Sequence, residues 1–265
     1  MSADAARPAG VRSAGARRRW PVSLRLTGAT AERVLHQVRG DHRSVVMVLL
    51  LPAVLLSLMA WIYDGTPVFD RIGPAMLALF PFTVMFLLTS VTTLRERQTG
   101  TLERLLTTPL GKADLVLGYG CAFGLLAVAQ SAVAVAVSVG LLGLDVAGPS
   151  VALLVVAVLA AVLGTALGLL ASAFAATELQ AVQMMPAVVL PQVLLCGLIL
   201  TREQLPTGLR ELSSLLPLSH AVDAMTAVAV LGEPWGEVSG SLLLVLAFVV
   251  TALLGGAATL RRRTT

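Results

Sequence analysis

The residues that most often carry out chemistry in proteins are few in this sequence, and their spacing builds no nucleotide-binding site. A phosphate-binding loop requires a glycine, four further residues, and then Gly-Lys-Ser or Gly-Lys-Thr. The only lysine, Lys112, follows Gly111, but Leu106 stands at the position of the first glycine and Ala113 at that of the hydroxyl. The sequence therefore predicts that this chain does not hydrolyse ATP by itself.

Other kinds of catalysis also lack their residues. The three histidines, His36, His42 and His220, fall outside the long apolar segments, and no His-Glu-x-x-His or Gly-x-Ser-x-Gly sequence occurs. Hydrolysis would require a nucleophile beside a base, or metal ligands at a fixed spacing. Cys121 and Cys196 both lie within apolar segments, where cysteine packs as a small hydrophobic residue. The sequence thus predicts a chain that is not an enzyme and binds no metal or cofactor of its own.

Two amide side chains remain as candidates for contact with a substrate. Gln130 and Gln192 lie within long apolar segments, where an unpaired polar group costs roughly 2 kcal/mol or more. They could line a substrate pathway or form hydrogen bonds between helices, and the residues alone leave both readings open. The same segments carry no charged residue in their middle, which argues against coupling to ions or protons and favours an apolar or amphipathic substrate.

The elements that must position these residues are membrane spans. Only 13% of the residues are charged and 57% are hydrophobic, whereas a soluble domain carries about 25% charged residues. Six segments of at least 20 residues contain no Asp, Glu, Lys or Arg, and about 20 helical residues cross a hydrocarbon core of about 30 Å. Their continuous apolar character excludes the alternating strands of a barrel. The predicted spans are about 44–63, 72–94, 114–141, 150–176, 181–200 and 239–260.

The basic residues predict the orientation of the chain. Lys and Arg concentrate in short cytoplasmic loops. If both termini are cytoplasmic, the cytoplasmic side holds 16 of the 19 basic residues and the outer side only Arg71, Arg202 and Arg210. We therefore expect a multi-pass protein of the plasma membrane. Its basic character reflects topology and contact with lipids of the inner leaflet, and it does not indicate nucleic acid binding.

Two segments precede the first span. Residues 1–26, rich in Ala, Arg and Gly, predict a disordered basic cytoplasmic tail, and residues 27–265 form a single membrane domain. Within that domain, Thr30–Arg43 places Val34, Leu35 and Val38 on one helical face. This pattern predicts an amphipathic helix on the inner leaflet, although a plain solvated lead-in would also fit.

A cytoplasmic loop joins the second and third spans. Within it, the sequence predicts a short helix that is capped at Thr101 and ended by Pro109. Three leucines share one face of this helix at i, i+3 and i+4 spacing, namely Leu102, Leu105 and Leu106. A helix with an apolar face at the tip of two spans is suited to dock in a groove of another protein, or else to rest on lipid.

The outer segment between the fifth and sixth spans, about 201–237, is too long for a tight turn and too apolar for a free loop. Pro206 and Pro217 divide it into short helices, which lie on the outer face or re-enter the membrane. His220 and Asp223 are three residues apart and can pair. That pair would be either structural or part of a proton relay.

Small residues indicate where helices approach closely. In the fourth predicted span, Gly164, Gly168, Ser172 and Ala176 form a stripe, and Gly120 and Gly124 recur in the third. Such stripes serve packing within one subunit or between two subunits. Because six helices are few for enclosing a pathway, we expect two copies of the chain to form a homodimer with twelve spans.

The loop after the second span resembles a known family signature. Residues 95–110, Arg-Glu-Arg-Gln-Thr-Gly-Thr-Leu-Glu-Arg-Leu-Leu-Thr-Thr-Pro-Leu, closely resemble the cytoplasmic signature of type-2 ABC exporter permeases of the daunorubicin-resistance type. Residues 216–220 are similar to the stretch after the fifth span in that family, and the likeness extends from about residue 27 to 260. In that family the loop carries a coupling helix that fits a cleft in a separate ATPase subunit. The resemblance places the coupling site at Arg95, Glu96, Gly100, Thr101, Leu102, Glu103, Leu105, Leu106 and Pro109.

The resemblance implies a function as well as a fold. It implies the permease subunit of an exporter for a hydrophobic or amphipathic substrate, such as a drug, an antibiotic or a lipid. ATP and Mg²⁺ would bind to the partner ATPase, and the assembly would contain two permeases and two ATPases. A departure from the family is the loop between the fourth and fifth spans, where Glu178 is the only charge. Export of a polysaccharide or glycolipid, or an ATP-independent transporter or channel, are the alternatives.

Overall fold

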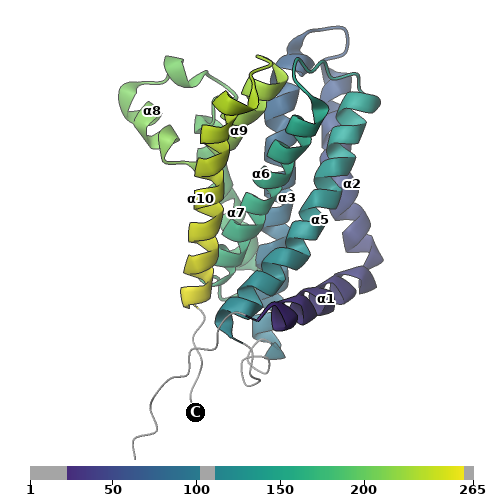
Figure 1. The fold of residues 1–265 in the computed structure, drawn as a ribbon, viewed down its shortest axis with the longest axis vertical. Helices are drawn as coiled ribbons and strands as arrows, with labels where there is room; N and C mark the ends of the chain where they lie inside the picture. The colour runs from purple at the N-terminus through teal and green to yellow at the C-terminus, as the bar shows by residue number, and fades with distance from the viewer. Residues whose placement is uncertain (1–22, 102–110, 260–265) are drawn as a thin grey trace, which may run out of the picture.

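The computed structural model describes residues 23–101 and 111–259, and every regular element over these ranges is a helix (Figure 1). The elements are α1 (Leu24–Gly40), α2 (His42–Ile62), α3 (Val68–Gln98), α5 (Lys112–Gly140), α6 (Ser150–Ser172), α7 (Glu178–Leu195), η1 (Arg202–Gln204), α8 (Thr207–Ser214), α9 (Pro217–Ala229) and α10 (Trp235–Thr259).

Six of these helices, namely α2, α3, α5, α6, α7 and α10, are long and apolar enough to cross a membrane. The predicted fold class, an all-α integral membrane protein with six spans, is therefore confirmed. In Figure 1 these helices run side by side along the long axis of the molecule. The chain is a multi-pass membrane protein.

Two spans end earlier than the sequence predicted. Helix α6 stops at Ser172, before the predicted end at residue 176, because the chain already turns there toward α7. Helix α7 stops at Leu195, before the predicted end at residue 200. Gly197 has a φ of +92°, and glycine in this left-handed region commonly ends a helix.

Helix α1 lies across one end of the bundle, which we call the α1 end (Figure 1). Its buried residues, Thr27, Thr30 and Val34, face the bundle, and Leu35 and Val38 are partly buried against the same core. The predicted amphipathic helix is thus present, although it begins at Leu24, inside the predicted tail. Residues 1–22 of that tail, and residues 102–110 of the predicted coupling helix, lie outside the described residues.

Helices α3 and α6 pack closely along their length, and glycines make the approach possible. A Cβ atom added at Gly164 would lie 2.1 Å from the carbonyl oxygen of Phe82, and one at Gly168 would lie 2.5 Å from that of Phe86. The two glycines of the predicted stripe therefore serve packing within the subunit, whereas Ala176 lies beyond the end of α6. By contrast, a Cβ at Gly124 of α5 would have no heavy atom within 4 Å.

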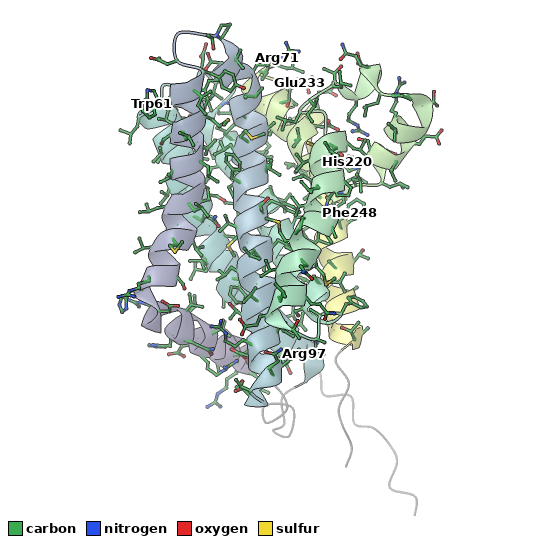
Figure 2. The ribbon with its side chains drawn as sticks, turned by 180° about the vertical axis from the view of Figure 1, so that it is seen from behind. Trp61, Arg71, Arg97, His220, Glu233 and Phe248 are labelled. Atoms are coloured by element: carbon green, nitrogen blue, oxygen red, sulfur yellow. The ribbon has the colours of Figure 1, made fainter. Side chains whose placement is uncertain are left out.

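The outer segment contains the short helices that its prolines predicted. Helix α9 is largely buried and packs on α3, α6 and α10, whereas α8 projects from the side of the bundle (Figure 1). Figure 2 shows Arg97 at the α1 end and Trp61, Arg71 and Glu233 at the opposite end. Whether the chain re-enters the membrane within this segment is not tested by the structure, and re-entry stays a prediction.

Candidate coupling site at the α1 end of the bundle

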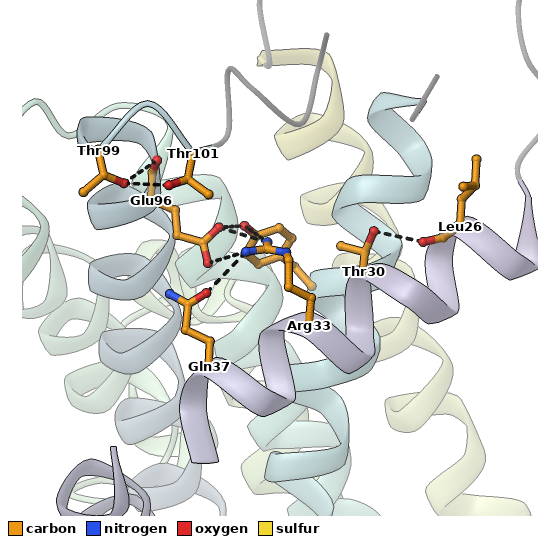
Figure 3. A network of polar contacts seen from close by, with 8 residues as sticks. Leu26, Thr30, Arg33, Gln37, Glu96, Thr99 and Thr101 are labelled. Atoms are coloured by element: carbon orange, nitrogen blue, oxygen red, sulfur yellow. Dashed lines mark hydrogen bonds and ion pairs between the residues drawn. The ribbon is translucent and has the colours of Figure 1, made fainter. Parts of the chain in front are cut away.

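Three helices meet at a buried carboxylate near the end of α3. Glu96 of α3 is only 3% exposed. Arg33 of α1 donates to both of its oxygens, from Nη1 to Oε1 at 3.4 Å and from Nη2 to Oε2 at 3.1 Å. Tyr119 of α5 donates its hydroxyl to Glu96 Oε2 and accepts from Arg33 Nη2 at 2.9 Å. Figure 3 shows this network, which joins α1, α3 and α5 through one ion pair and one phenol.

The sequence brings α1 to this position by a close approach to α5. A Cβ at Gly118 would lie 2.6 Å from the Cβ of Thr30, so only glycine permits this packing. Asp114, which is 1% exposed, anchors the start of α1, since its Oδ1 accepts from the backbone N–H of Ser23 at 2.7 Å. Its Oδ2 accepts from the backbone N–H of Gly111 at 3.1 Å. One carboxylate therefore fixes the beginnings of both α1 and α5.

Further polar contacts tie the end of α3 to two more helices. Arg95 forms a bidentate ion pair with Glu178 at the start of α7, with nitrogen–oxygen distances of 3.0 and 3.1 Å. Arg97 donates from Nη1 to the backbone oxygen of Ser172 at the end of α6. The last turns of α3 thus contact α1, α5, α6 and α7, and a displacement of this helix end would change its contacts with all four helices.

The chain leaves α3 by a sharp break. Gly100 has a φ of +70°, a conformation that glycine adopts without strain. On either side of it, the hydroxyls of Thr99 and Thr101 lie 3.1 Å apart (Figure 3). The break that the sequence predicted at Gly100 is present, and the segment that follows Thr101 starts at the site where the polar contacts converge.

The structure sorts the predicted coupling residues into two groups. Arg95, Glu96, Gly100 and Thr101 all lie at or just beyond the end of α3, and the side chain of Glu96 is buried in the three-helix junction. The others lie outside the described residues, namely Leu102, Glu103, Leu105, Leu106 and Pro109.

Sequence reasoning missed Arg33, Tyr119 and Asp114. A signal was present for Tyr119, because a phenol in an otherwise apolar span needs a hydrogen-bond partner. No such signal marked Arg33, which is one of several basic residues that precede the first span.

The two buried amides behave differently. Gln192 of α7 donates to the backbone oxygen of Val188 at 3.0 Å and accepts from the backbone N–H of Leu218 at 3.1 Å. Its side chain therefore joins α7 to the start of α9. Gln130 of α5 is fully buried, and neither atom of its amide has a partner among the residues that the structure describes. Its contact with a substrate stays a prediction.

Across the described part of the chain, no group of three or more His, Cys, Asp or Glu residues is placed to hold a metal ion.

In the outer segment, Asp223 of α9 pairs with Arg202 of η1. The ring of His220 instead contacts the backbone oxygen of Ser214 at 2.8 Å and stacks near Phe248 (Figure 2). The structure thus pairs Asp223 with arginine where the sequence suggested histidine.

The partial burial of Asp223 predicts a dependence of stability on pH. Burial raises the pKa of this carboxyl above its ordinary value of 3.8, against the opposing effect of the Arg202 guanidinium. The folded protein then binds the proton more tightly than the unfolded chain, so the contribution of this group to the free energy of unfolding falls as the pH rises above 3.8. Asp223→Asn cannot titrate, and we expect the melting temperature of the variant to rise relative to that of the wild type as the pH increases from 3.8. A difference in melting temperature between Asp223→Asn and the wild type that stays constant over this pH range would contradict the raised pKa of Asp223.

Comparison with known proteins identifies the bundle. Residues 26–230 match the model of the ABC-2 type transporter family. The chain belongs to this family. The match to the ABC-2 type transporters begins in α1 and ends just after α9, so it includes the three-helix junction and the segment after Gly100.

Individual ABC-2 relatives agree. The probable multidrug ABC transporter permease YbhR of Escherichia coli is 26% identical over 185 residues, which cover 70% of this chain and 50% of YbhR. The ABC transporter G family member 20 of Dictyostelium discoideum is 26% identical over 183 residues, which cover 68% of this chain and 25% of that protein. The chain thus spans half the length or less of these relatives. The resemblance to type-2 ABC permeases that the loop sequence indicated is confirmed.

Proposed function

We propose that this chain is the membrane-spanning permease subunit of an ABC exporter, and that a separate ATPase subunit powers it. Its family, and the name of the Escherichia coli relative as a probable multidrug ABC transporter permease, support this function. The sequence of the chain contains no phosphate-binding loop of its own. The cargo would be a hydrophobic or amphipathic compound such as a drug, an antibiotic or a lipid, because no charged residue lies in the middle of a span.

The observation that carries the proposal is the convergence of polar contacts on the end of α3. An ATPase that docks on the segment after Gly100 would push or pull on this helix end. The contacts of Arg95, Glu96 and Arg97 would pass that displacement to α1, α5, α6 and α7. Because these contacts are directional hydrogen bonds and ion pairs, the helices would move as a unit.

The proposal includes an orientation and an assembly. The α1 end faces the cytoplasm, because most of the basic residues precede α2, follow α3 or follow α10. In the most apolar stretch of helices α2, α7 and α10, only 17–22% of the residues are buried. The faces of these helices are therefore available to lipid and to a second copy of the chain. A homodimer of permeases with two ATPases in the plasma membrane would use both kinds of contact.

Two substitutions in the proposed coupling helix test this function. Leu102→Asp would place a charge on the apolar docking face, and Glu103→Lys would reverse a charge beside it. We expect both variants to insert in the membrane at normal levels while export and ATPase stimulation fall to background. The measurement is substrate efflux together with the ATPase activity of the co-purified partner. Normal export in both variants would show that the coupling site lies elsewhere.

A further inference from the structure

A groove of about 510 Å³ runs along α3 on the side that faces α2 and α7. Both helices pack on α3, which forms the floor of the groove. The apolar lining includes Met47 and Leu51 of α2, Val84, Leu87 and Val91 of α3, and Val182 of α7. Met47 is 65% exposed and Leu51 is 39% exposed, so residues 23–101 and 111–259 leave apolar surface of this groove uncovered.

The polar lining of the groove is confined to its α1 end. It comprises Gln37, Asp41, Ser44, Thr92 and Arg95. Asp41 accepts hydrogen bonds from the backbone and hydroxyl of Ser44 at 3.2 and 2.6 Å, and these bonds hold the pKa of Asp41 below its ordinary value. Its carboxylate is therefore charged at neutral pH. Arg95 uses Nε and Nη2 to bind Glu178, and no other described residue occupies its third nitrogen, Nη1, which can therefore donate to another acceptor.

The length of the groove matches one leaflet of a bilayer. From Val84 to Arg95 the axis of α3 rises by about 16 Å, at about 1.5 Å per residue. The hydrocarbon core of a membrane is about 30 Å thick, so one leaflet contributes about half of that. A molecule that fills this groove has an apolar body about as long as one leaflet and a polar group at the level of Asp41 and Arg95.

We propose that the groove binds one phospholipid of the leaflet beside α1, with a zwitterionic headgroup at Asp41 and Arg95 and an acyl chain along α3. An ammonium group complements the carboxylate of Asp41, and a phosphate complements the guanidinium of Arg95. Because both charges stand at one end of an otherwise apolar groove, phosphatidylethanolamine fits better than a purely anionic lipid. This site does not depend on the proposed transport function, and its test requires no ATPase.

Native mass spectrometry of the purified full-length chain tests the site. The probes are phosphatidylethanolamine, phosphatidylglycerol and soluble phosphoethanolamine, which carries the headgroup alone. We expect the wild type to retain one phosphatidylethanolamine per chain and no phosphoethanolamine. Leu87→Trp fills the groove, and overpacking of this kind is expected to weaken retention by roughly tenfold or more. Leu246→Trp places the same ring on α10, at a side chain that is 46% exposed, and is expected to retain lipid as the wild type does.

A second variant tests the headgroup. Asp41→Asn removes the charge while asparagine still caps the start of α2, and we expect the preference for phosphatidylethanolamine over phosphatidylglycerol to fall about fivefold. Equal lipid retention by the wild type and Leu87→Trp would overturn the site. So would a wild type that binds no lipid while Leu87→Trp converts a dimer to a monomer, because the groove would then be a subunit contact. An unchanged preference in Asp41→Asn would overturn the headgroup assignment.

Discussion

Replacing Glu96 by alanine is expected to lower the free energy of unfolding by about 3 kcal/mol, the lower end of the range for breaking a buried ion pair. The lower end applies because Arg33 is 31% exposed and water can partly solvate it, whereas Glu96 is 3% exposed. Tyr119 would also lose the acceptor for its hydroxyl. In the proposed mechanism, the same change would disconnect α3 from α1 and α5 and so reduce export by a larger factor than it reduces the amount of folded protein.

The matched control for this variant is the exposed ion pair on the same helix. Arg95 is 63% exposed and Glu178 is 42% exposed, and a pair of this kind contributes about 0–1 kcal/mol. Glu178→Ala should therefore change the melting temperature little. If Glu96→Ala and Glu178→Ala have equal effects on stability, the junction is not the buried link that the structure describes.

A triple variant separates stability from coupling. Replacing all members of a buried polar cluster by apolar residues is often neutral for stability, so Arg33→Leu with Glu96→Leu and Tyr119→Phe, which leaves no unpaired hydroxyl, should melt close to the wild type. We expect its export, measured as substrate efflux with the ATPase partner present, to stay low because the directional contacts are gone. Full export by the stable triple variant would show that packing alone, and not this polar junction, couples the helices.

Replacing Gly164 by valine is expected to lower the stability of the bundle by about 3 kcal/mol or more, at the upper end of the range for overpacking. A Cβ at this position would lie 2.1 Å from the carbonyl oxygen of Phe82 and 2.9 Å from its carbonyl carbon. These are backbone atoms, which cannot rotate aside, so α3 and α6 would have to separate. The separation would also loosen the second close approach, between Gly168 and Phe86.

Gly124→Val is the matched control, because it places the same side chain on a span where a Cβ meets no heavy atom within 4 Å. The change in helix propensity is the same at both positions and cancels in the comparison. Thermal unfolding of the two variants in detergent measures the difference. Similar melting temperatures for Gly164→Val and Gly124→Val would contradict the packing of α3 against α6.

The spans could be predicted because the bilayer imposes a length and excludes charge, and both constraints are visible along the sequence. The same reasoning made α3 too short at both ends, since that helix extends beyond the apolar run 72–94 to include Asp70 and Arg95. A helix need not end where the hydrocarbon ends, because polar residues continue it into the interface. The stop of α7 before Gly197 depends on a local backbone conformation that the charge-free run of residues did not reveal.

The location of the candidate site could be predicted from the sequence, but the residues that contact one another there could not. The loop sequence marked the end of α3 as the coupling site, and Gly100 does form the predicted break. The partners of Glu96, however, lie 63 residues away in α1 and 23 residues away in α5. Their arrangement depends on how α1 packs across the bundle, which in turn depends on the close contact of Gly118 with Thr30. Periodicity within single helices carries no information about such a contact.

The most direct test of the proposed function is transport by the purified chain in liposomes, with and without its ATPase partner. We expect a hydrophobic or amphipathic substrate to accumulate against its gradient only when the partner and ATP are both present. Accumulation should stop when the phosphate-binding lysine of the partner is replaced. Uphill transport by this chain alone would contradict the claim that energy enters through an ATPase docked beyond Gly100.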